Sequence, residues 1–307
     1  MNLLYLIEHK YFQKKMSRGA RFHTWEAISK HPDVKMSLMT GPGFPDFPGS
    51  IMDLNPDYVL AYKPLDCEWH PTKAPLILNY NEMWDEEWTV TEIEQSGANM
   101  VICHHENDFK KYENTIQGVK FVHIPHGVSE WRFEVAGQRE LACRPISALF
   151  SGVFSPQFYP VRAKLKHVVD QVPNSKVLSH PGYRLEDVIA CEEQFKRYVD
   201  HLSWSRVSLC CTSRYKYSLN KLHESIAAGC VVFSDLPHDG NFNAKLGKYI
   251  QELGNSESVG SITERVKHVC DSPSEFQVMT TEARQVVLDE FGHNRYAERF
   301  LSACRSL

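Results

Sequence analysis

Short apolar runs alternate with longer polar or amphipathic segments along most of the chain, and this alternation restricts the fold more than any other feature. Six such runs occupy the first half: LLYLI (3–7), VKMSLM (34–39), YVLAY (58–62), PLILNY (75–80), NMVICHH (99–105) and KFVHIPHG (120–127). Strands separated by helix-length segments pair in parallel through crossover connections. The pattern therefore predicts an α/β fold with parallel sheets.

The same alternation restarts after a charged, irregular stretch at 128–144. Strand-like runs at 146–152, 175–180, 206–211 and 230–235 surround helix-like segments at 161–172, 192–202 and 220–229, and three further helical segments follow residue 256. Two rounds of this pattern predict two Rossmann-like, doubly wound domains. We expect an N-terminal domain over 1–135, a C-terminal domain over 136–290, and a final helix over 291–307 that crosses back to the first domain.

The composition is that of an ordinary soluble globular protein, with 42% hydrophobic residues, 23% charged residues and a net charge of −4. This charge gives no basic footprint for nucleic acid. No apolar run approaches the ~18 residues of a membrane span, and charge appears at Glu8, too early for a secretory signal. Nine cysteines contain no C-x-x-C pair, which disfavours a disulfide framework or a zinc knuckle. We expect a cytoplasmic protein with no nucleic-acid partner and no membrane span.

Ligands of open parallel sheets bind outside the carboxyl ends of the strands, so polar residues that follow strands are candidates for function. The basic loop after the first strand contains Arg18 and Gly19, which either approach a phosphate or sugar or form a solvated connection. Glu82 and Asp85 follow the run at 75–80. Each is interpreted either as a general base or as part of an acidic helix start.

Histidines gather after the next two strands. His104 and His105 end the run at 99–105, and adjacent side chains point in different directions, so at most one is expected to face a ligand. His123 and His126 end the following run, and together with Asp108 they raise the alternative of a metal site. The spacing H-E-x-x-H, which would support a metal site, is absent.

The second half places a glycine and basic residues after strands. Gly152 ends the run at 146–152, where a residue without Cβ allows a ligand to approach the backbone. Tyr183, in the turn HPGY, is expected to receive a flat base. Arg214, Lys216 and Lys221 lie within eight residues, which indicates a diphosphate site or, alternatively, a solvated basic loop. Neither a Walker A nor a G-x-G-x-x-G motif is present.

The stretch SLNKLHESIAAGCVVFSD (218–235) reads as a helix followed by a buried strand. Asn220 and Glu224 are four residues apart and share a helix face, with Lys221 one position further round. Residues 226–228 are small or apolar and are expected to pack on the sheet. Gly229 then allows the chain to turn sharply into the strand.

This stretch resembles the donor-site signature of GT-B glycosyltransferases, particularly the CgeB-like group. IPHGVSEWRF (124–133) is similar to the segment that ends the first domain of that family. LFSGVFSPQFYPVR (149–162) and HPGY (180–183) are similar to its glycine-containing first strand and its nucleotide-side turn. The resemblance covers residues 120–240 well, and the first hundred residues only by architecture.

The resemblance implies two Rossmann-like domains facing across a cleft, and a metal-independent hexosyl- or pentosyltransferase without a cofactor. Such an enzyme moves a sugar from a nucleoside diphosphate sugar to a hydroxyl of a glycan or small-molecule acceptor. By position, Glu224 would accept hydrogen bonds from the ribose, Lys221 would lie near the diphosphate, and His104 or His105 would contact the donor sugar.

The remaining candidate residues complete three groups. The catalytic group is His104, His105 and Asp85; the donor group is Gly152, Tyr183, Ser213, Arg214, Lys216, Ser218, Asn220, Lys221 and Glu224; the acceptor group is Arg18, Gly19 and Glu82. Lys216 departs from the Glu-x7-Glu motif of retaining members, because it stands where the first Glu is expected. A cation cannot accept hydrogen bonds from sugar hydroxyls, so the stereochemical outcome is not predicted.

Two alternatives remain open at the level of sequence. One is a metal-dependent phosphoesterase that uses His104, His105, Asp108, His123 and His126. The other is a non-catalytic protein that binds nucleotide sugars.

Overall fold

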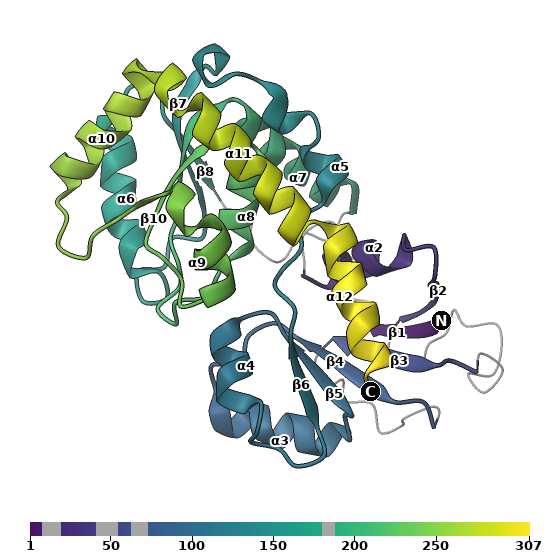
Figure 1. Cartoon of the computed structure of the whole chain (residues 1–307). Coiled ribbons are helices and arrows are strands. Elements are labelled where there is room, and N and C mark those ends of the chain that lie inside the picture. Colours follow the sequence, from purple (N-terminus) through teal and green to yellow (C-terminus); the bar gives the residue numbers. More distant parts are fainter. Residues whose placement is uncertain (8–19, 41–54, 63–72, 180–187) are drawn as a thin grey trace. The chain divides into compact units, whose positions relative to one another are not determined.

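A computed structural model of the chain describes residues 1–7, 20–40, 55–62, 73–179 and 188–307 (Figure 1). The chain divides into two compact units. Unit 1 comprises Met1–Gly127, Leu185–Glu192 and His293–Leu307, and unit 2 comprises Val128–Arg184 and Glu193–Gly292. Each unit has its own parallel sheet, as the alternating apolar runs predict. No helix in the described part of the chain is long and apolar enough to cross a membrane.

Unit 1 contains a six-stranded sheet. Its strands are β1 (Asn2–Ile7), β2 (Lys35–Thr40), β3 (Tyr58–Tyr62), β4 (Leu76–Tyr80), β5 (Met100–Cys103) and β6 (Lys120–His123). Its helices are α2 (Ala20–Ser29), α3 (Glu86–Ser96), α4 (Glu106–Tyr112) and α12 (His293–Arg305). The strand order is β2-β1-β3-β4-β5-β6, and each neighbouring pair is parallel.

Apolar side chains cover both faces of this sheet. Leu4, Val59 and Leu78 point to one face, where they pack with side chains of α3 and α4 such as Ile93 and Tyr112. The alternate residues of the same strands pack on the other face against α2 and α12, through side chains including Ala27, Ile28, Phe300 and Leu301. Strands that are buried on both faces read as continuous apolar runs, which explains the pattern in the sequence.

Unit 2 contains a five-stranded sheet. Its strands are β7 (Ile146–Gly152), β8 (Lys176–Ser179), β9 (Ser205–Leu209), β10 (Val231–Ser234) and β11 (Ile250–Glu252). Its helices are α5 (Glu130–Phe133), α6 (Pro160–Gln171), α8 (Asn220–Ala227), α9 (Gly240–Leu246), α10 (Val259–Asp271) and α11 (Pro273–Phe291), and α7 (Val188–Ser203) begins within the stretch assigned to unit 1. The strand order is β11-β10-β9-β7-β8, again parallel throughout.

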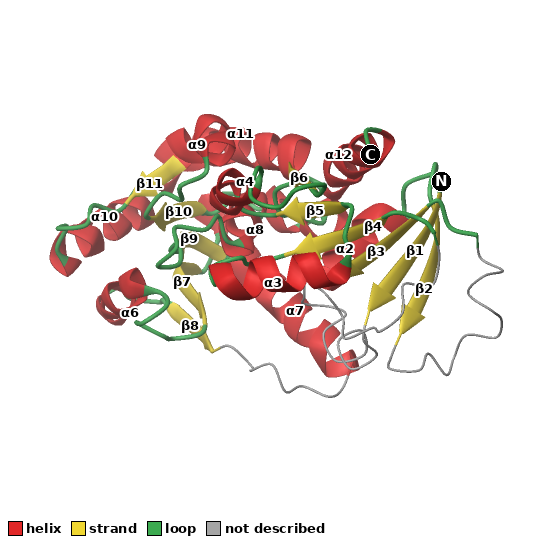
Figure 2. Cartoon of the chain, turned by 90° about the horizontal axis from the view of Figure 1, so that it is seen from below, coloured by secondary structure: helices red, strands yellow, loops and turns green. Residues whose placement is uncertain are grey.

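Helices lie on both sides of this second sheet (Figure 2). Leu149 and Val232 face a core that contains side chains of α7, α8, α9 and α11. Their neighbours Phe150 and Val231 face a second core that contains side chains of α6 and α10. The prediction of doubly wound α/β units is therefore confirmed for both sheets.

The two sheets share one strand order. Counted from its own first strand, each begins 2-1-3-4-5, with the first strand between the second and the third. The order reverses between the first and third strands, and ligands of such sheets bind at the carboxyl ends of these two strands. In unit 2 these are the ends of β7 and β9. In unit 1 they are the ends of β1 and β3, which run into residues outside the described part of the chain.

Several predicted strands are too long at their carboxyl ends. The runs 99–105, 120–127 and 206–211 extend beyond the observed ends at Cys103, His123 and Leu209. The extra residues include buried side chains such as those of His104, His105, Ile124 and Cys210. Apolar character continues there because these loops are buried, so hydrophobicity alone does not mark where each strand stops.

Helix α8 ends as the sequence predicts. Gly229 has φ of +71°, and its N–H donates to the carbonyl of Ile226 at 2.8 Å. The N–H of Cys230 donates to the carbonyl of Ser225 at 3.1 Å. These two bonds form a Schellman motif, which stops the helix and turns the chain directly into β10.

We expect Gly229→Ala to lower the free energy of unfolding by more than the ~1 kcal/mol cost of placing a side chain at positive φ. A Cβ at this position would also lie 3.0 Å from Nη2 of Arg144, which is buried. Gly97→Ala isolates the backbone contribution, because Gly97 has φ of +66° and a Cβ there would meet no atom of the described residues within 4 Å. Urea unfolding of both variants measures the difference, and equal losses would contradict the prediction.

Candidate functional site

Two cationic side chains, those of Arg162 and Lys221, lie close to the carboxyl end of β7. Gly152 has φ of +110°, and a Cβ there would lie 2.7 Å from Nη1 of Arg162 and 2.9 Å from Cε of Lys221. The guanidinium of Arg162 is buried, donates to the carbonyl of Val153, and contacts Sγ of Cys211 at 3.3 Å. Glycine suits this position because φ of +110° is strained for residues with a side chain, and a Cβ would also require the ends of the Arg162 and Lys221 side chains to move.

Glu224 lies in the second turn of α8, close to the same strand end, and is buried. Its Oε2 accepts a hydrogen bond of 3.0 Å from the hydroxyl of Tyr198 in α7. Burial raises the pKa of the Glu224 carboxyl above its ordinary value. The charge of Lys221, the hydrogen bond from Tyr198 and the charge of Arg132 each lower this pKa, but together they do not cancel the increase that burial causes. The ring of Tyr198 also faces Lys221, whose Nζ is 4.6 Å from the ring centroid.

The start of α8 presents polar groups that the described chain does not satisfy. Its N-cap residue, Leu219, makes no side-chain capping bond. The hydroxyl of Ser218 and Oδ1 of Asn220 are buried and have no hydrogen-bond partner among the described residues. Buried polar atoms without partners are rare and call for an explanation such as a ligand. Helix N-termini favour anions, so the α8 amides, the Ser218 hydroxyl and Lys221 suit a phosphate, whereas Oδ1 of Asn220 can only accept a hydrogen bond from a ligand donor.

The loop after β9 is held by Asp235 at the end of β10. Asp235 is buried, and it accepts hydrogen bonds from the N–H and hydroxyl of Thr212. Nζ of Lys216 donates to Oδ2 of the same carboxylate at 2.7 Å. Lys216 has φ of +58°, an uncommon conformation for a residue with a side chain. The ion pair therefore ties a strained loop residue to the sheet.

Arg214 and Ser213 belong to the same loop. The Arg214 guanidinium is 4.9 Å from the ring centroid of Phe158 and 4.7 Å from that of Tyr215, and it donates to the Tyr215 hydroxyl. The backbone N–H of Arg214 donates to the carbonyl of Phe158 at 2.7 Å. Oγ of Ser213 is occupied by the N–H of Tyr215 at 3.2 Å. Arg214 is exposed, so its guanidinium can contact an anion.

In unit 1, three histidine rings pack together after β5 and β6. His104 and His126 stack with centroids 4.3 Å apart, and His105 meets His126 edge-on at 5.2 Å. All three side chains are buried, and the expectation that at most one of His104 and His105 faces a ligand stays a prediction. Nδ1 of His104 lies 2.9 Å from the carbonyl of Ile124. Because a carbonyl only accepts, Nδ1 carries the proton and Nε2 is an acceptor.

Burial lowers the pKa of His104 to about 4, and the hydrogen bond to Ile124 offsets this only in part. The imidazole is therefore neutral at physiological pH. Its Nε2 is buried and has no partner among the described residues. A neutral ring with a free acceptor nitrogen is suited to receive a hydrogen bond from a hydroxyl group.

The acidic residues after β4 have mainly structural contacts. Asp85 is the N-cap of α3, and its Oδ1 accepts from the N–H of Trp88 at 3.1 Å. Asp108 is buried and accepts from the N–H of Met83 at 3.1 Å. Glu82 is half-buried at the carboxyl end of β4. The capping interpretation of Asp85 thus has a direct contact in the structure.

A metal site from the histidines has no geometric support. Within the described ranges, no group of three or more His, Cys, Asp or Glu side chains is arranged to hold a metal ion. His123, one of the proposed ligands, instead stacks on Phe109 with ring centroids 6.3 Å apart. The metal-dependent phosphoesterase is therefore not favoured.

Three predicted site residues, Arg18, Gly19 and Tyr183, lie outside the described residues. The structure brings together Gly152, Lys221 and Glu224 through Arg162 and Tyr198, and it places Lys216 with Asp235. Among the residues that the sequence analysis does not assign to a site are Tyr198, Arg132 and Asp235. Asp235 could have been found from the sequence, because it is a polar residue at the carboxyl end of a predicted strand. Tyr198 had none, because a buried tyrosine in an amphipathic helix looks like core.

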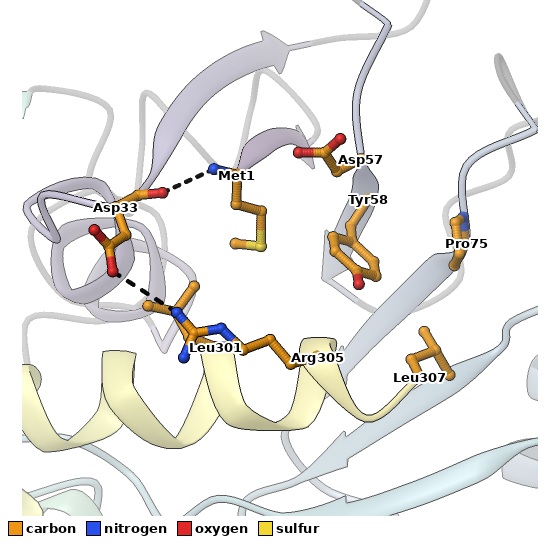
Figure 3. Close-up of a pocket in the computed structure, with 8 residues that line it drawn as sticks. All are labelled: Met1, Asp33, Asp57, Tyr58, Pro75, Leu301, Arg305 and Leu307. Carbon is orange, nitrogen blue, oxygen red and sulfur yellow. Dashed lines mark hydrogen bonds and ion pairs between the residues drawn. The ribbon is translucent and has the colours of Figure 1, made fainter.

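A pocket of about 660 Å³ lies in unit 1, at the amino ends of the strands of its sheet (Figure 3). Met1 precedes β1, Asp57 precedes β3, and Arg305 ends α12. The N-terminal ammonium donates to the carbonyl of Asp33 at 2.9 Å, and the Asp33 carboxylate lies 3.7 Å from Arg305. These polar groups pair with one another at the amino ends of the strands, away from the edge where such sheets bind ligands.

The fold matches known structures although the sequence does not. No protein-family model matches the chain, and no curated protein is significantly similar in sequence. Sucrose-phosphate synthase from Thermosynechococcus elongatus aligns over 100% of this chain and 99% of its own, with a TM-score of 0.66 and 11% identity. Alr3699/HepE from Anabaena, solved in complex with UDP and glucose, aligns over 100% of both chains with a TM-score of 0.62 and 12% identity.

The same architecture also occurs in UDP-GlcNAc 2-epimerase from Neisseria meningitidis, which aligns over 100% of both chains with a TM-score of 0.53 and 11% identity. At such identities these likenesses establish the fold, which is the two-domain α/β fold of GT-B glycosyltransferases. A fold hosts more than one chemistry, so the function has to be argued from the site.

We expect Glu224→Gln to raise the free energy of unfolding of the ligand-free protein at pH 7. Burial raises the folded-state pKa of Glu224, so the folded protein loses stability as the pH rises above the unfolded pKa of about 4.3. The neutral amide avoids this cost, and its advantage should shrink as the pH falls to 4. Chemical unfolding at both pH values measures it, with Glu264→Gln on exposed α10 as control. A variant less stable at pH 7 would contradict the prediction.

We expect His104 to make the protein less stable in mild acid. Its folded-state pKa of about 4 lies below the unfolded value near 6.5, so stability falls as the pH drops through this window. The share of His104 in the loss between pH 7 and pH 5 should be about 2 kcal/mol, and His104→Gln should remove this share, while the buried His223, whose pKa is lowered to about 3, contributes separately. His268→Gln, at an exposed histidine of α10, is the control substitution. Equal pH dependence in wild type and His104→Gln would refute this role.

Proposed function

We propose that the protein is a glycosyltransferase that binds a nucleoside diphosphate sugar at the carboxyl ends of β7 and β9. One observation carries this proposal: at the strand-order reversal of unit 2, a glycine with positive φ, a lysine and a buried carboxylate meet at the start of a helix. A nucleoside diphosphate offers the matching groups, namely hydroxyls for the carboxylate and phosphates for the cation and helix amides.

The roles follow from the chemistry of each group. Glu224 accepts hydrogen bonds from the ribose hydroxyls, because an ionised carboxylate is an acceptor only. Lys221 and the amides at the start of α8 lie close to the diphosphate, together with the Ser218 hydroxyl. Gly152 leaves room for the ligand to approach the backbone. The proposal is supported by the fold shared with sucrose-phosphate synthase and with HepE, whose structure contains UDP and glucose.

In the proposed reaction, an acceptor hydroxyl forms a bond to the anomeric carbon of the donor sugar. The bond from that carbon to the diphosphate oxygen breaks, and the acceptor proton passes to a base or to the departing phosphate. Negative charge grows on the diphosphate, and Lys221 with the α8 amides stabilises it. The reaction proposed here therefore uses side-chain cations in place of a divalent metal.

We assign acceptor contacts to unit 1. The neutral His104, with Nε2 available as an acceptor, is proposed to receive a hydrogen bond from a sugar hydroxyl. Asp85 is given no proton-transfer role, since it caps α3. The sugar is a hexose or pentose, and the acceptor is a glycan or small molecule that carries a hydroxyl group.

A thermal-shift panel of UDP, ADP, GDP and dTDP with their sugar conjugates tests donor binding. A ligand of the native state raises the melting temperature in proportion to RT ln(1 + [L]/Kd). Glu224→Ala should weaken the bound nucleotide roughly 10–150-fold, since charge-assisted hydrogen bonds contribute about 1.5–3 kcal/mol. Lys221→Ala should lower kcat more than affinity if the charge is stabilised mainly in the transition state.

Lys248→Ala is the matched control, because Nζ of Lys248 also lies over a tyrosine ring, 4.7 Å from the centroid of Tyr249. It should leave nucleotide affinity unchanged. Activity that survives excess EDTA would support the metal-independent reaction. Failure of every nucleoside diphosphate and conjugate to stabilise the protein would overturn the proposal. Binding and interconversion of a sugar nucleotide without transfer would favour an epimerase.

A further inference from the structure

Tyr198 contacts both groups on which nucleotide binding would depend. It lies in α7 and is nine-tenths buried, with 9% of its surface exposed. Its hydroxyl donates to Oε2 of Glu224 at 3.0 Å. The face of its ring lies 4.6 Å from Nζ of Lys221. One side chain therefore contacts the carboxylate through its oxygen and the ammonium through its π system.

The hydroxyl contact engages Oε2 of Glu224, whereas Oε1 accepts no hydrogen bond from the residues that the structure describes. Within the residues that the structure describes, Tyr198 is the hydrogen-bond donor to this carboxylate. A tyrosine has one proton to donate, and that proton occupies Oε2. Oε1 is the oxygen that remains for an incoming hydroxyl. Burial and the nearby Glu224 charge keep the pKa of Tyr198 well above 10, so the phenol stays protonated at physiological pH.

The ring contact holds Lys221 on the opposite side. A cation is attracted to the π electrons on the face of an aromatic ring, and this contact restricts the rotation of the flexible lysine stem. The ring itself is fixed by an edge-to-face contact with Phe195, whose centroid is 6.1 Å away. Tyr198 thus has its own support in α7, independent of α8.

We propose that Tyr198 is a positioning residue, which aims Oε1 of Glu224 and the ammonium of Lys221 at the ribose and diphosphate of one nucleotide. The identity of that ligand rests on the proposed function, whereas the effect on Glu224 does not. The groups that face Glu224 are Lys221 of α8, Arg132 of α5 and Tyr198 of α7, and Cys210 after β9 lies near Tyr198.

The first arm of the test needs no ligand. Tyr198→Phe removes one oxygen and keeps the ring, so it should raise the pKa of Glu224, because the hydroxyl bond favours the ionised form. NMR titration of ¹³C-labelled glutamate side chains measures this, with Glu224→Gln to assign the signal. Tyr249→Phe, at another buried tyrosine of unit 2, should cause no change. Tyr198→Leu should repeat the shift with different core packing. An unchanged Glu224 titration in both variants would overturn the proposal.

The second arm separates the two contacts by calorimetry with UDP and with pyrophosphate. Tyr198→Phe should weaken UDP about 5–10-fold and leave pyrophosphate unchanged, since the ring still faces Lys221. Tyr198→Leu should weaken both. In a Glu224→Ala background, Tyr198→Phe should have no further effect on UDP, as expected for residues that act as a unit.

Equal losses from Tyr198→Phe in the wild-type and Glu224→Ala backgrounds would show that the hydroxyl does not act through Glu224, and would overturn the proposal. If the wild-type protein binds no nucleoside diphosphate, the proposed function fails. In that case the NMR titration still decides whether Tyr198 controls Glu224. The two failures are therefore distinguishable.

Discussion

The parallel pairing of β7 with β9 is the constraint on which the rest of unit 2 depends. Ile146 pairs with Ser205 and Phe150 with Leu209, so both strands end at the same edge of the sheet. A parallel connection requires a crossover, and the crossovers of these two strands leave on opposite faces. The chain after β7 enters α6 in one core, and the chain after β9 enters α8 in the other. The divergence of these two connections leaves Gly152 and the start of α8 at the point where the sheet is open to a ligand.

The same arrangement explains why charged groups are tolerated there. Glu224 is surrounded by Tyr198, Lys221 and Arg132, yet its pKa is still raised, so these partners compensate its desolvation only in part. A protein selected for stability alone would replace such a carboxylate with an apolar or amide side chain. Residual cost of this kind concentrates at functional sites, where a ligand supplies the missing hydrogen bonds. The orphaned Ser218 hydroxyl and Asn220 amide oxygen at the same helix start fit this explanation.

The sequence predicts much of the fold because strands buried on both faces leave a strong signal. The runs at 3–7, 75–80 and 146–152 each correspond to a strand, and Gly229 ends α8 with the expected geometry. Strand ends were harder to predict, since His104 and Cys210 lie in loops that are as buried as the strands. Strand order was not accessible, because it depends on contacts between segments far apart in the chain.

The site was predictable only where function leaves a local pattern. Lys221 and Glu224 stand out as the charged residues of a helix that ends in the small or apolar residues 226–228. Tyr198 comes from a different helix, and nothing in its own segment distinguishes it from the core tyrosines. Arg132 likewise belongs to a short helix far from Glu224 in sequence. Groups that act through one another across elements are visible only when the elements are packed.

Lys216 shows how a contact changes the interpretation of a residue. As sequence, it adds a third cation to the basic loop and breaks a pattern of carboxylates. In the fold, its ammonium is paired with the buried Asp235, so the pair carries no net charge toward a ligand. Asp235 in turn is fully engaged by Thr212 and Lys216, which leaves it anchoring the loop. In the proposed donor site, compensation of the diphosphate would therefore depend on Lys221, the exposed Arg214 and the α8 amides, while Lys216 would hold the loop through Asp235.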